Sequence, residues 1–200
     1  MSAEEVFQLL DREVWAVTAG DDQQHGASLA TWVMQASLLT DCPVVVAGLA
    51  PNHHTAEVLD RSGAMAVHLL RLDQTELALQ FAARSGHERD KLSSVPTRHV
   101  KATPVPILAD CAAWLAGRVF ARLNAGDRVY YWMEVLESER LDDGPLLRQS
   151  QVIAAADPET RDRLREDRMR DMQLHAPWAK AWRRSVALDE TFRLTPHPED

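Results

Sequence analysis

The sequence has few cysteines, and none of them belongs to a recognisable redox or metal motif. Among its 200 residues the cysteines are Cys42 and Cys111, without a C-x-x-C pair, which argues against a disulfide scaffold. The motifs G-x-S-x-G, Walker A and H-E-x-x-H are also missing, as is a G-x-G-x-x-G that follows a strand. The enzyme classes that depend on these motifs are therefore not expected.

Positive charge is in the minority. The chain has 22 lysines and arginines against 30 aspartates and glutamates, a formal net charge of −8, which argues against nucleic acid as the main partner. No apolar run approaches the roughly 20 residues that cross a bilayer, so no membrane partner is expected. The first residues, MSAEEVFQLLDREVW, are partly acidic. This start predicts no signal peptide and a cytoplasmic protein.

Segments with β-strand patterns make up most of the chain. The run PVVVAGLAP, residues 43–51, is apolar between two prolines, as expected for a strand buried on both faces. Residues 112–123 and 128–139 are rich in aromatic and β-branched side chains, and the turn NAGD joins them into a long antiparallel hairpin. Because strands and helices do not alternate regularly, we predict a mainly β fold, a β-barrel with peripheral helices.

Helices are expected between these strands. Amphipathic spacing and capping residues predict them over residues 4–12, 55–63 and 73–86, with a loop over residues 87–106. Asp73 and Glu76 are expected to form the capping box of the third helix. His53 and His54 are adjacent and point apart on an extended chain, so we interpret them as loop residues and expect no metal site.

The C-terminal part of the chain has a different character. Asp157 is a good N-cap and Pro158 suits the first helical turn, so a charged helix is expected from there to Pro177. A last short helix would carry Trp178 and Trp182. We therefore predict a domain over residues 1–150 and a helical extension over residues 151–200, packed on the barrel or on a partner subunit.

Two segments do not fit a plain strand or helix. GASLATWVMQASL, residues 26–38, combines small and hydroxyl side chains with one large indole. FAARSGHERDKL, residues 81–92, combines a helix end with several charges. Residues 29–37 match a T/V-A-S/T-W/F-V-x-x-x-S stretch, residues 81–92 match F-x-x-R/Q-S-G followed by D-K-F/L, and residues 109–118 match A-D-x-x-x-W-L. In this order the chain resembles the flavin reductase-like family of FMN-binding split β-barrel proteins.

The resemblance implies a Greek-key split β-barrel of the FMN-binding type with a C-terminal helical extension. It also implies FMN as the cofactor, with FAD as an alternative, NAD(P)H as co-substrate and a homodimer with each site at the subunit interface. The cofactor-binding residues that it implies are Leu29, Ala30, Thr31, Trp32, Gln35, Ala36, Ser37, Arg84, Ser85, Gly86, Asp90 and Lys91. Small residues let main-chain groups approach the polar edge of a flavin, and cationic side chains suit its phosphate.

One position departs from the family pattern. Many members have G-D-H where this sequence has Gly126, Asp127 and Arg128, and the resemblance places that histidine near the nicotinamide. Arg128 is therefore either a contact to the nicotinamide or flavin, or a surface charge of the hairpin. Since an arginine does not titrate near neutral pH, no catalytic acid or base is assigned.

The function expected from the resemblance is electron transfer from NAD(P)H to flavin. The reduced flavin would pass electrons to a small-molecule redox substrate, a partner oxygenase or an electron-acceptor protein. Two alternatives stay open: a flavoredoxin-like FMN carrier that does not turn over NAD(P)H, and a split-barrel protein with no flavin.

Overall fold

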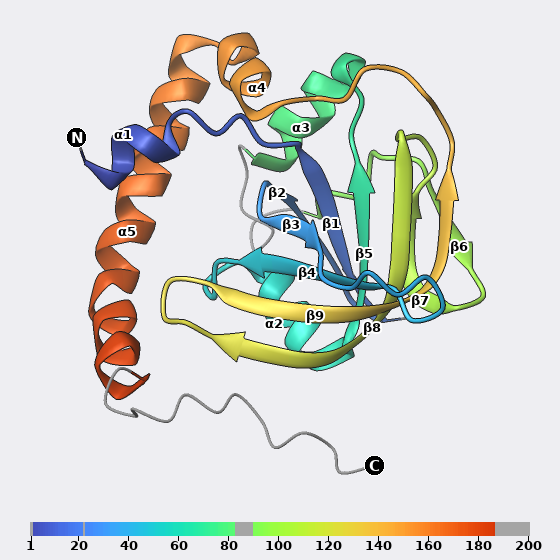
Figure 1. The fold of residues 1–200 in the computed structure, drawn as a ribbon. Helices are drawn as coiled ribbons and strands as arrows, with labels where there is room; N and C mark the ends of the chain where they lie inside the picture. The colour runs from blue at the N-terminus through green and yellow to red at the C-terminus, as the bar shows by residue number, and fades with distance from the viewer. Residues whose placement is uncertain (1, 22, 83–89, 187–200) are drawn as a thin grey trace.

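The computed structural model of the chain describes residues 2–21, 23–82 and 90–186, and a curled antiparallel sheet dominates it (Figure 1). The strands are β1 (Trp15–Gly20), β2 (His25–Ala30), β3 (Val33–Gln35), β4 (Val44–Leu49), β5 (Ala64–Leu69), β6 (Thr97–Val100), β7 (Thr103–Leu108), β8 (Ala113–Asn124) and β9 (Val129–Arg140). Seven of them form one sheet in the order β2-β1-β5-β8-β9-β4-β3, and β6 pairs with β7 in a second sheet. The predicted hairpin is confirmed as β8 and β9.

The sheet closes on itself at the segment that was hardest to interpret from sequence. β2 and β3 are at opposite edges of the sheet, yet only Thr31 and Trp32 separate them in the chain. Two residues cannot span an open seven-stranded sheet, because neighbouring strands are about 4.8 Å apart. The sheet therefore curls until its edges meet at this link. This geometry confirms the predicted mainly β fold, a barrel with peripheral helices.

Strands in the middle of the sheet are buried on both faces. In β5, Met65 and Val67 pack in one hydrophobic cluster and Ala66 in the other. His68 lies in the same strand without solvent contact; its Nδ1 is 3.1 Å from the carbonyl oxygen of Ala16, and its Nε2 accepts the Leu108 N–H at 3.1 Å. These partners suit a neutral imidazole, and burial lowers the pKa of His68 to about 4.

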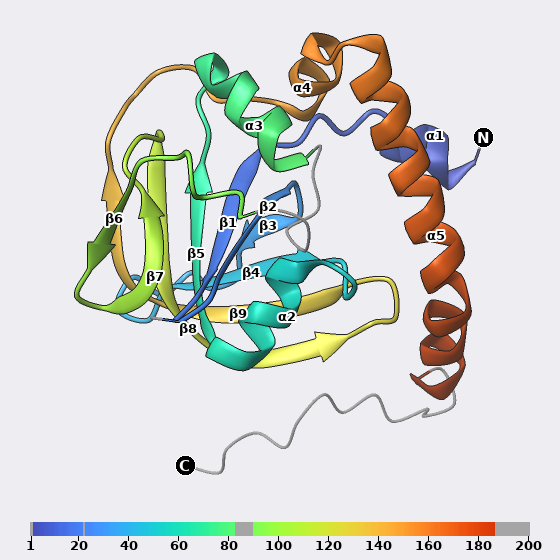
Figure 2. The same ribbon diagram turned by 180° about the vertical axis from the view of Figure 1, so that it is seen from behind.

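The helices lie around the barrel. They are α1 (Ala3–Phe7), α2 (His54–Ser62), the 3-10 turn η1 (Leu72–Gln74), α3 (Thr75–Ala82), α4 (Gln149–Ala155) and α5 (Pro158–Val186). α2 packs on β1 and β2, as Figure 2 shows from behind. α5 runs along one side of the barrel from α4 to the turn between β8 and β9 (Figure 1). No helix among the described residues is long and apolar enough to cross a membrane.

Several predicted elements are corrected by the structure. The predicted loop contains the β6–β7 hairpin, whose prolines are tolerated because β7 has a ladder partner on one side only. α1 is shorter than predicted, and its apolar residues are exposed. Asp73 does not cap a helix: its carboxylate pairs with Arg71, while Gln74 accepts the Arg71 N–H at 3.0 Å. The predicted stop at Gly86 lies outside the described residues.

The C-terminal helix is longer than its sequence predicts. α5 continues through Pro177 to Val186, although a proline inside a helix costs about 3 kcal/mol. The segment after Pro177 packs on the β8–β9 turn. There Gly126 has φ 94°, and a Cβ atom on it would lie 2.3 Å from the nitrogen of Ala179. This close backbone approach requires glycine at position 126.

Candidate functional site

The link that closes the barrel carries an exposed aromatic cluster. The ring of Trp32 stacks on Tyr130 of β9, with centroids 6.3 Å apart and an interplanar angle of 12°. The guanidinium carbon of Arg128 lies 4.9 Å from the centre of the Trp32 ring. The main-chain carbonyl oxygen of Trp32 accepts the Gly48 N–H at 2.8 Å. Since Trp32 is 38% exposed, the cluster offers a flat aromatic wall and a fixed cation to a ligand.

A cavity of about 310 Å³ opens near the other end of β2. The residues that line it are Gln23, Gln24, His25, Gly26, Ala27, His54, Asp90 and Lys91. They come from β2 and the loop before it, from the first residue of α2, and from the segment after α3. Thus β2 joins the two parts of the candidate site, because it begins in the cavity and leads directly into Thr31 and Trp32.

The cavity suits an anion. The Lys91 ammonium donates a hydrogen bond to the carbonyl oxygen of Phe81 at 2.6 Å, and burial lowers its pKa to about 8. No carboxylate of the described residues forms an ion pair with Lys91. His25 has a buried Nδ1 without a hydrogen-bond partner among the same residues. A phosphate in this cavity would supply the countercharge that Lys91 lacks.

Sequence comparison matches residues 7–155 to the model of the flavin reductase like domain. The chain belongs to the flavin reductase-like family. This match confirms the resemblance found in the motifs and, with the curled sheet, the predicted split barrel. Among curated proteins none matches the chain significantly.

Solved structures of this flavin reductase-like fold include several relatives. A flavin reductase domain protein from Arthrobacter sp. FB24 is 26% identical at a TM-score of 0.65, over 73% of this chain and 87% of that one. BorF, the flavin reductase component of a bacterial two-component tryptophan halogenase, is 23% identical at a TM-score of 0.65. The match covers 73% of this chain and 90% of BorF. A protein from Sinorhizobium meliloti 1021 is 24% identical at a TM-score of 0.64, and the match covers 73% of this chain. The present chain spans only about half of that longer protein, 49% of its length.

The predicted cofactor residues of this flavin reductase-like chain fall into three groups. Leu29, Ala30, Thr31 and Trp32 lie at the end of β2 and in the link, beside the aromatic cluster. Gln35, Ala36 and Ser37 lie in and after β3, where Gln35 donates to the carbonyl oxygen of Ser37 at 2.6 Å. Asp90 and Lys91 line the cavity. Arg84, Ser85 and Gly86 lie outside the described residues.

Asp90 has a structural contact as well. Its carboxylate accepts the Leu92 N–H at 2.9 Å, which fixes the backbone next to Lys91. This contact orients the lysine toward Phe81 and the cavity. Asp90 therefore lines the cavity beside Lys91 and also holds the backbone of that segment.

The structure adds residues that sequence reasoning missed. His25 and His54 line the cavity, and Tyr130 stacks on Trp32. Nothing in the polar loop before β2 signals a role for His25. His54 was interpreted as a loop histidine, but it is the first residue of α2. The hairpin register could have indicated Tyr130, because it places Tyr130 two positions from Arg128 on the same side of β9.

Proposed function

We propose that this protein is an FMN-binding oxidoreductase that moves electrons from NAD(P)H to flavin and on to an acceptor. The observation that carries the proposal is the arrangement along β2. The anion-binding cavity lies at Gly26 and Ala27, and the aromatic cluster lies at Thr31 and Trp32. Thr31 lies five positions after Gly26, about 16 Å along an extended chain at 3.3 Å per residue. A ligand with a phosphate at one end and a flat ring at the other fits this layout.

The side chains have separate tasks in this proposal. Lys91, together with Arg84, Ser85 and Gly86, would hold the phosphate by charge-assisted hydrogen bonds. The main chain of residues 29–32 and the polar groups of Gln35 and Ser37 would meet the polar edge of the ring. When bound, the flavin supplies the hydride-accepting chemistry. The protein's contribution is to hold the two ring systems in contact, which needs no acid or base side chain.

Arg128 is the residue that we assign to the ring end of the site. It lies over Trp32, and its Nη1 donates to the carbonyl oxygen of Asp127 at 2.5 Å. Both contacts fix the guanidinium in one place. In this position Arg128 would bind the nicotinamide donor or the flavin through its charge and its planar face, while the proton balance of hydride transfer would come from solvent.

Proteins of the same fold support the proposed donor and acceptor. The NADH:FAD oxidoreductase SgcE6 of Streptomyces globisporus C-1027 shares the fold at 19% identity and a TM-score of 0.63, over 74% of this chain and 85% of that one. Together with BorF, it supports NAD(P)H as donor and a partner oxygenase as one acceptor. FAD is the alternative cofactor, because nothing in the described cavity selects for or against an adenosine.

One experiment tests the proposal directly. The visible spectrum of the purified protein, before and after addition of FMN or FAD, reports flavin binding. Oxidation of NADH and NADPH with and without added FMN then reports turnover. Bound flavin with turnover supports the reductase. Bound flavin without turnover would instead indicate a flavoredoxin-like carrier. Protein that stays colourless with both flavins would exclude either function.

A further inference from the structure

The C-terminal helix is attached to the barrel by a small number of mostly polar contacts. α5 lies outside residues 7–155, which match the family domain. The Asp171 carboxylate accepts a hydrogen bond from Asn52 at 2.9 Å and lies 3.5 Å from Nε2 of His53. One turn of helix further on, His175 packs in the interface, and Ala179 lies against Gly126. Much of the apolar surface of α5 remains exposed, including Met172 and Trp178. Few contacts therefore decide whether α5 stays docked.

His175 is the unusual member of this interface. It is 1% exposed, and neither ring nitrogen has a hydrogen-bond partner among the described residues. Its ring lies 5.7 Å from that of Trp178. A buried imidazole without partners costs about 1–3 kcal/mol in folding. This cost is tolerated only while the ring is neutral, because a buried charge costs much more.

The charged groups around His175 come from every element that packs on it. Asp171 lies on α5 itself, Asp127 and Arg128 on the β8–β9 turn, and His53 before α2. Burial is the largest influence and lowers the pKa of His175; Arg128 and His53 lower it further, whereas Asp171 and Asp127 raise it. Asp171 remains ionised in the docked helix, because its contact with His53 lowers its pKa to about 2.

We propose that α5 is a pH-sensitive clamp on the turn that carries Arg128, held closed by neutral His175 and released when His175 is protonated. In the released helix the imidazole is in water and takes up a proton below about pH 6.5. In the docked helix it resists protonation. The docked state is therefore fully favoured above that pH and loses stability as the pH falls below it. Acidification would free the turn beside Trp32.

The clamp concerns the flavin site only if the proposed function holds, but the docking of α5 can be measured without flavin. Hydrogen exchange of α5 peptides, followed by mass spectrometry on the full chain at pH 7.5 and pH 5.5 and corrected for intrinsic rates, gives the opening equilibrium of the helix. We expect opening to increase about threefold or more at pH 5.5. Peptides of β5 report the separate pH dependence that buried His68 gives the barrel, and the opening of α5 is compared with theirs.

The decisive variant is His175→Leu, with His175→Gln as a second and His99→Gln as a control on the exposed β6–β7 hairpin. Leucine removes the unpartnered polar group, so this variant should fold at least as stably as the wild type. It should also lose the increase in opening at low pH. Without the buried imidazole, α5 should be about equally protected at pH 7.5 and pH 5.5. His99→Gln should behave as the wild type.

Two results would overturn the clamp. One is a wild-type helix with equal protection at both pH values. The other is a His175→Leu protein whose α5 still opens at pH 5.5. Flavin affinity, measured on the same samples at pH 7.5, keeps the two proposals apart: its loss contradicts the proposed function and leaves the exchange result for α5 unaffected.

Discussion

Arg128 lies over the indole of Trp32, with its guanidinium carbon 4.9 Å from the ring centre. The two residues come from different parts of the barrel: Arg128 lies in the β8–β9 turn, and Trp32 lies in the link between β2 and β3. The cation is thus held by an aromatic face and by the carbonyl oxygen of Asp127. This relationship defines the ring end of the proposed site.

Replacement of Arg128 should weaken binding of the nicotinamide donor more than binding of the flavin. We expect Arg128→Ala to raise KM for the preferred nicotinamide about fivefold to thirtyfold, equivalent to about 1–2 kcal/mol, while flavin affinity changes less. Arg128→Lys keeps the charge but loses the planar face, so it should recover only part of the effect. Steady-state kinetics with both variants checks this. Equal KM values in all three proteins would make Arg128 a surface charge of the hairpin.

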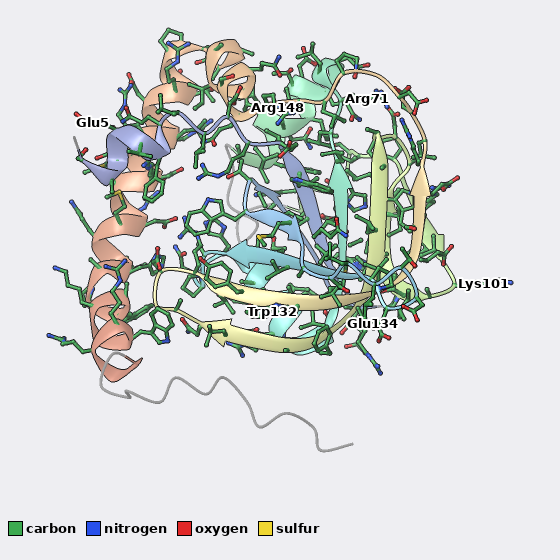
Figure 3. The ribbon with its side chains drawn as sticks, in the orientation of Figure 1. Glu5, Arg71, Lys101, Trp132, Glu134 and Arg148 are labelled. Atoms are coloured by element: carbon green, nitrogen blue, oxygen red, sulfur yellow. The ribbon has the colours of Figure 1, made fainter. Side chains whose placement is uncertain are left out.

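Loss of the proposed phosphate-binding cations should weaken binding of the cofactor. Lys91→Ala and Arg84→Ala should each cost about 1.5–3 kcal/mol of FMN binding, roughly the value of a hydrogen bond to a charged group. Titration of apoprotein by flavin fluorescence gives the dissociation constants. Lys101→Ala is the matched control, because Lys101 lies on the side of the molecule away from α5 (Figure 3). An unchanged dissociation constant for both variants would remove the assignment.

Flavin affinity should also depend on pH through Lys91. Burial lowers the pKa of this amine to about 8 in the flavin-free protein, so it is charged at pH 7 and largely neutral at pH 9. A bound phosphate favours the charged form and raises the pKa. Affinity should therefore fall as pH rises from 7 to 9, by up to about tenfold. The Lys91→Ala protein should bind weakly at both pH values; a pH dependence that persists in it would come from another group.

The apolar surface near the site predicts a dimer. Met34 is 62% and Leu38 94% exposed, and both lie near Trp32 in sequence. Side chains of this kind left in water mark an interface. We expect a homodimer with two flavins and loss of flavin when the subunits separate. Sedimentation of the flavin-loaded protein at low micromolar concentration tests this. The idea fails if a monomer still carries the yellow colour.

His68 predicts how folding stability depends on pH. Its pKa is about 4 in the folded protein and about 6.5 in the unfolded chain. The unfolded state therefore takes up a proton first, and stability falls as pH decreases from 6.5 to 4. The contribution between pH 7.5 and pH 4.5 is about 2.5 kcal/mol. Urea unfolding of the wild type and of His68→Gln at both pH values measures this effect. We expect the variant to have a lower free energy of unfolding at pH 7.5 but to lose less of it on acidification. Equal losses in the two proteins would contradict this role.

Local sequence patterns predicted the parts of the fold that depend on near neighbours. The β8–β9 hairpin follows from two alternating runs and a short turn, and β4 follows from an apolar run between prolines. α2 and its end at Gly63 were also predicted, to within a residue. The β6–β7 hairpin was missed, because Pro104 and Pro106 break the strand pattern and are accommodated only by the strand's position at an edge. The length of α5 was missed because a proline usually ends a helix, whereas α5 continues through Pro177 and packs on Gly126.

The sequence by itself determined the family, the β8–β9 hairpin and β4, and the residues 29–37 and 90–91 as segments of interest, because these depend on motif order and on short-range periodicity. Only the tertiary structure brought His25, His54 and Lys91 to one cavity, stacked Tyr130 and Arg128 on Trp32, and buried His175 between α5 and the barrel. Each of these contacts joins segments far apart in the chain. The stacking on Trp32 exists because the seven-stranded sheet closes at Thr31 and Trp32, whereas the burial of His175 depends on the docking of α5. No local pattern specifies which distant side chains such packing brings together.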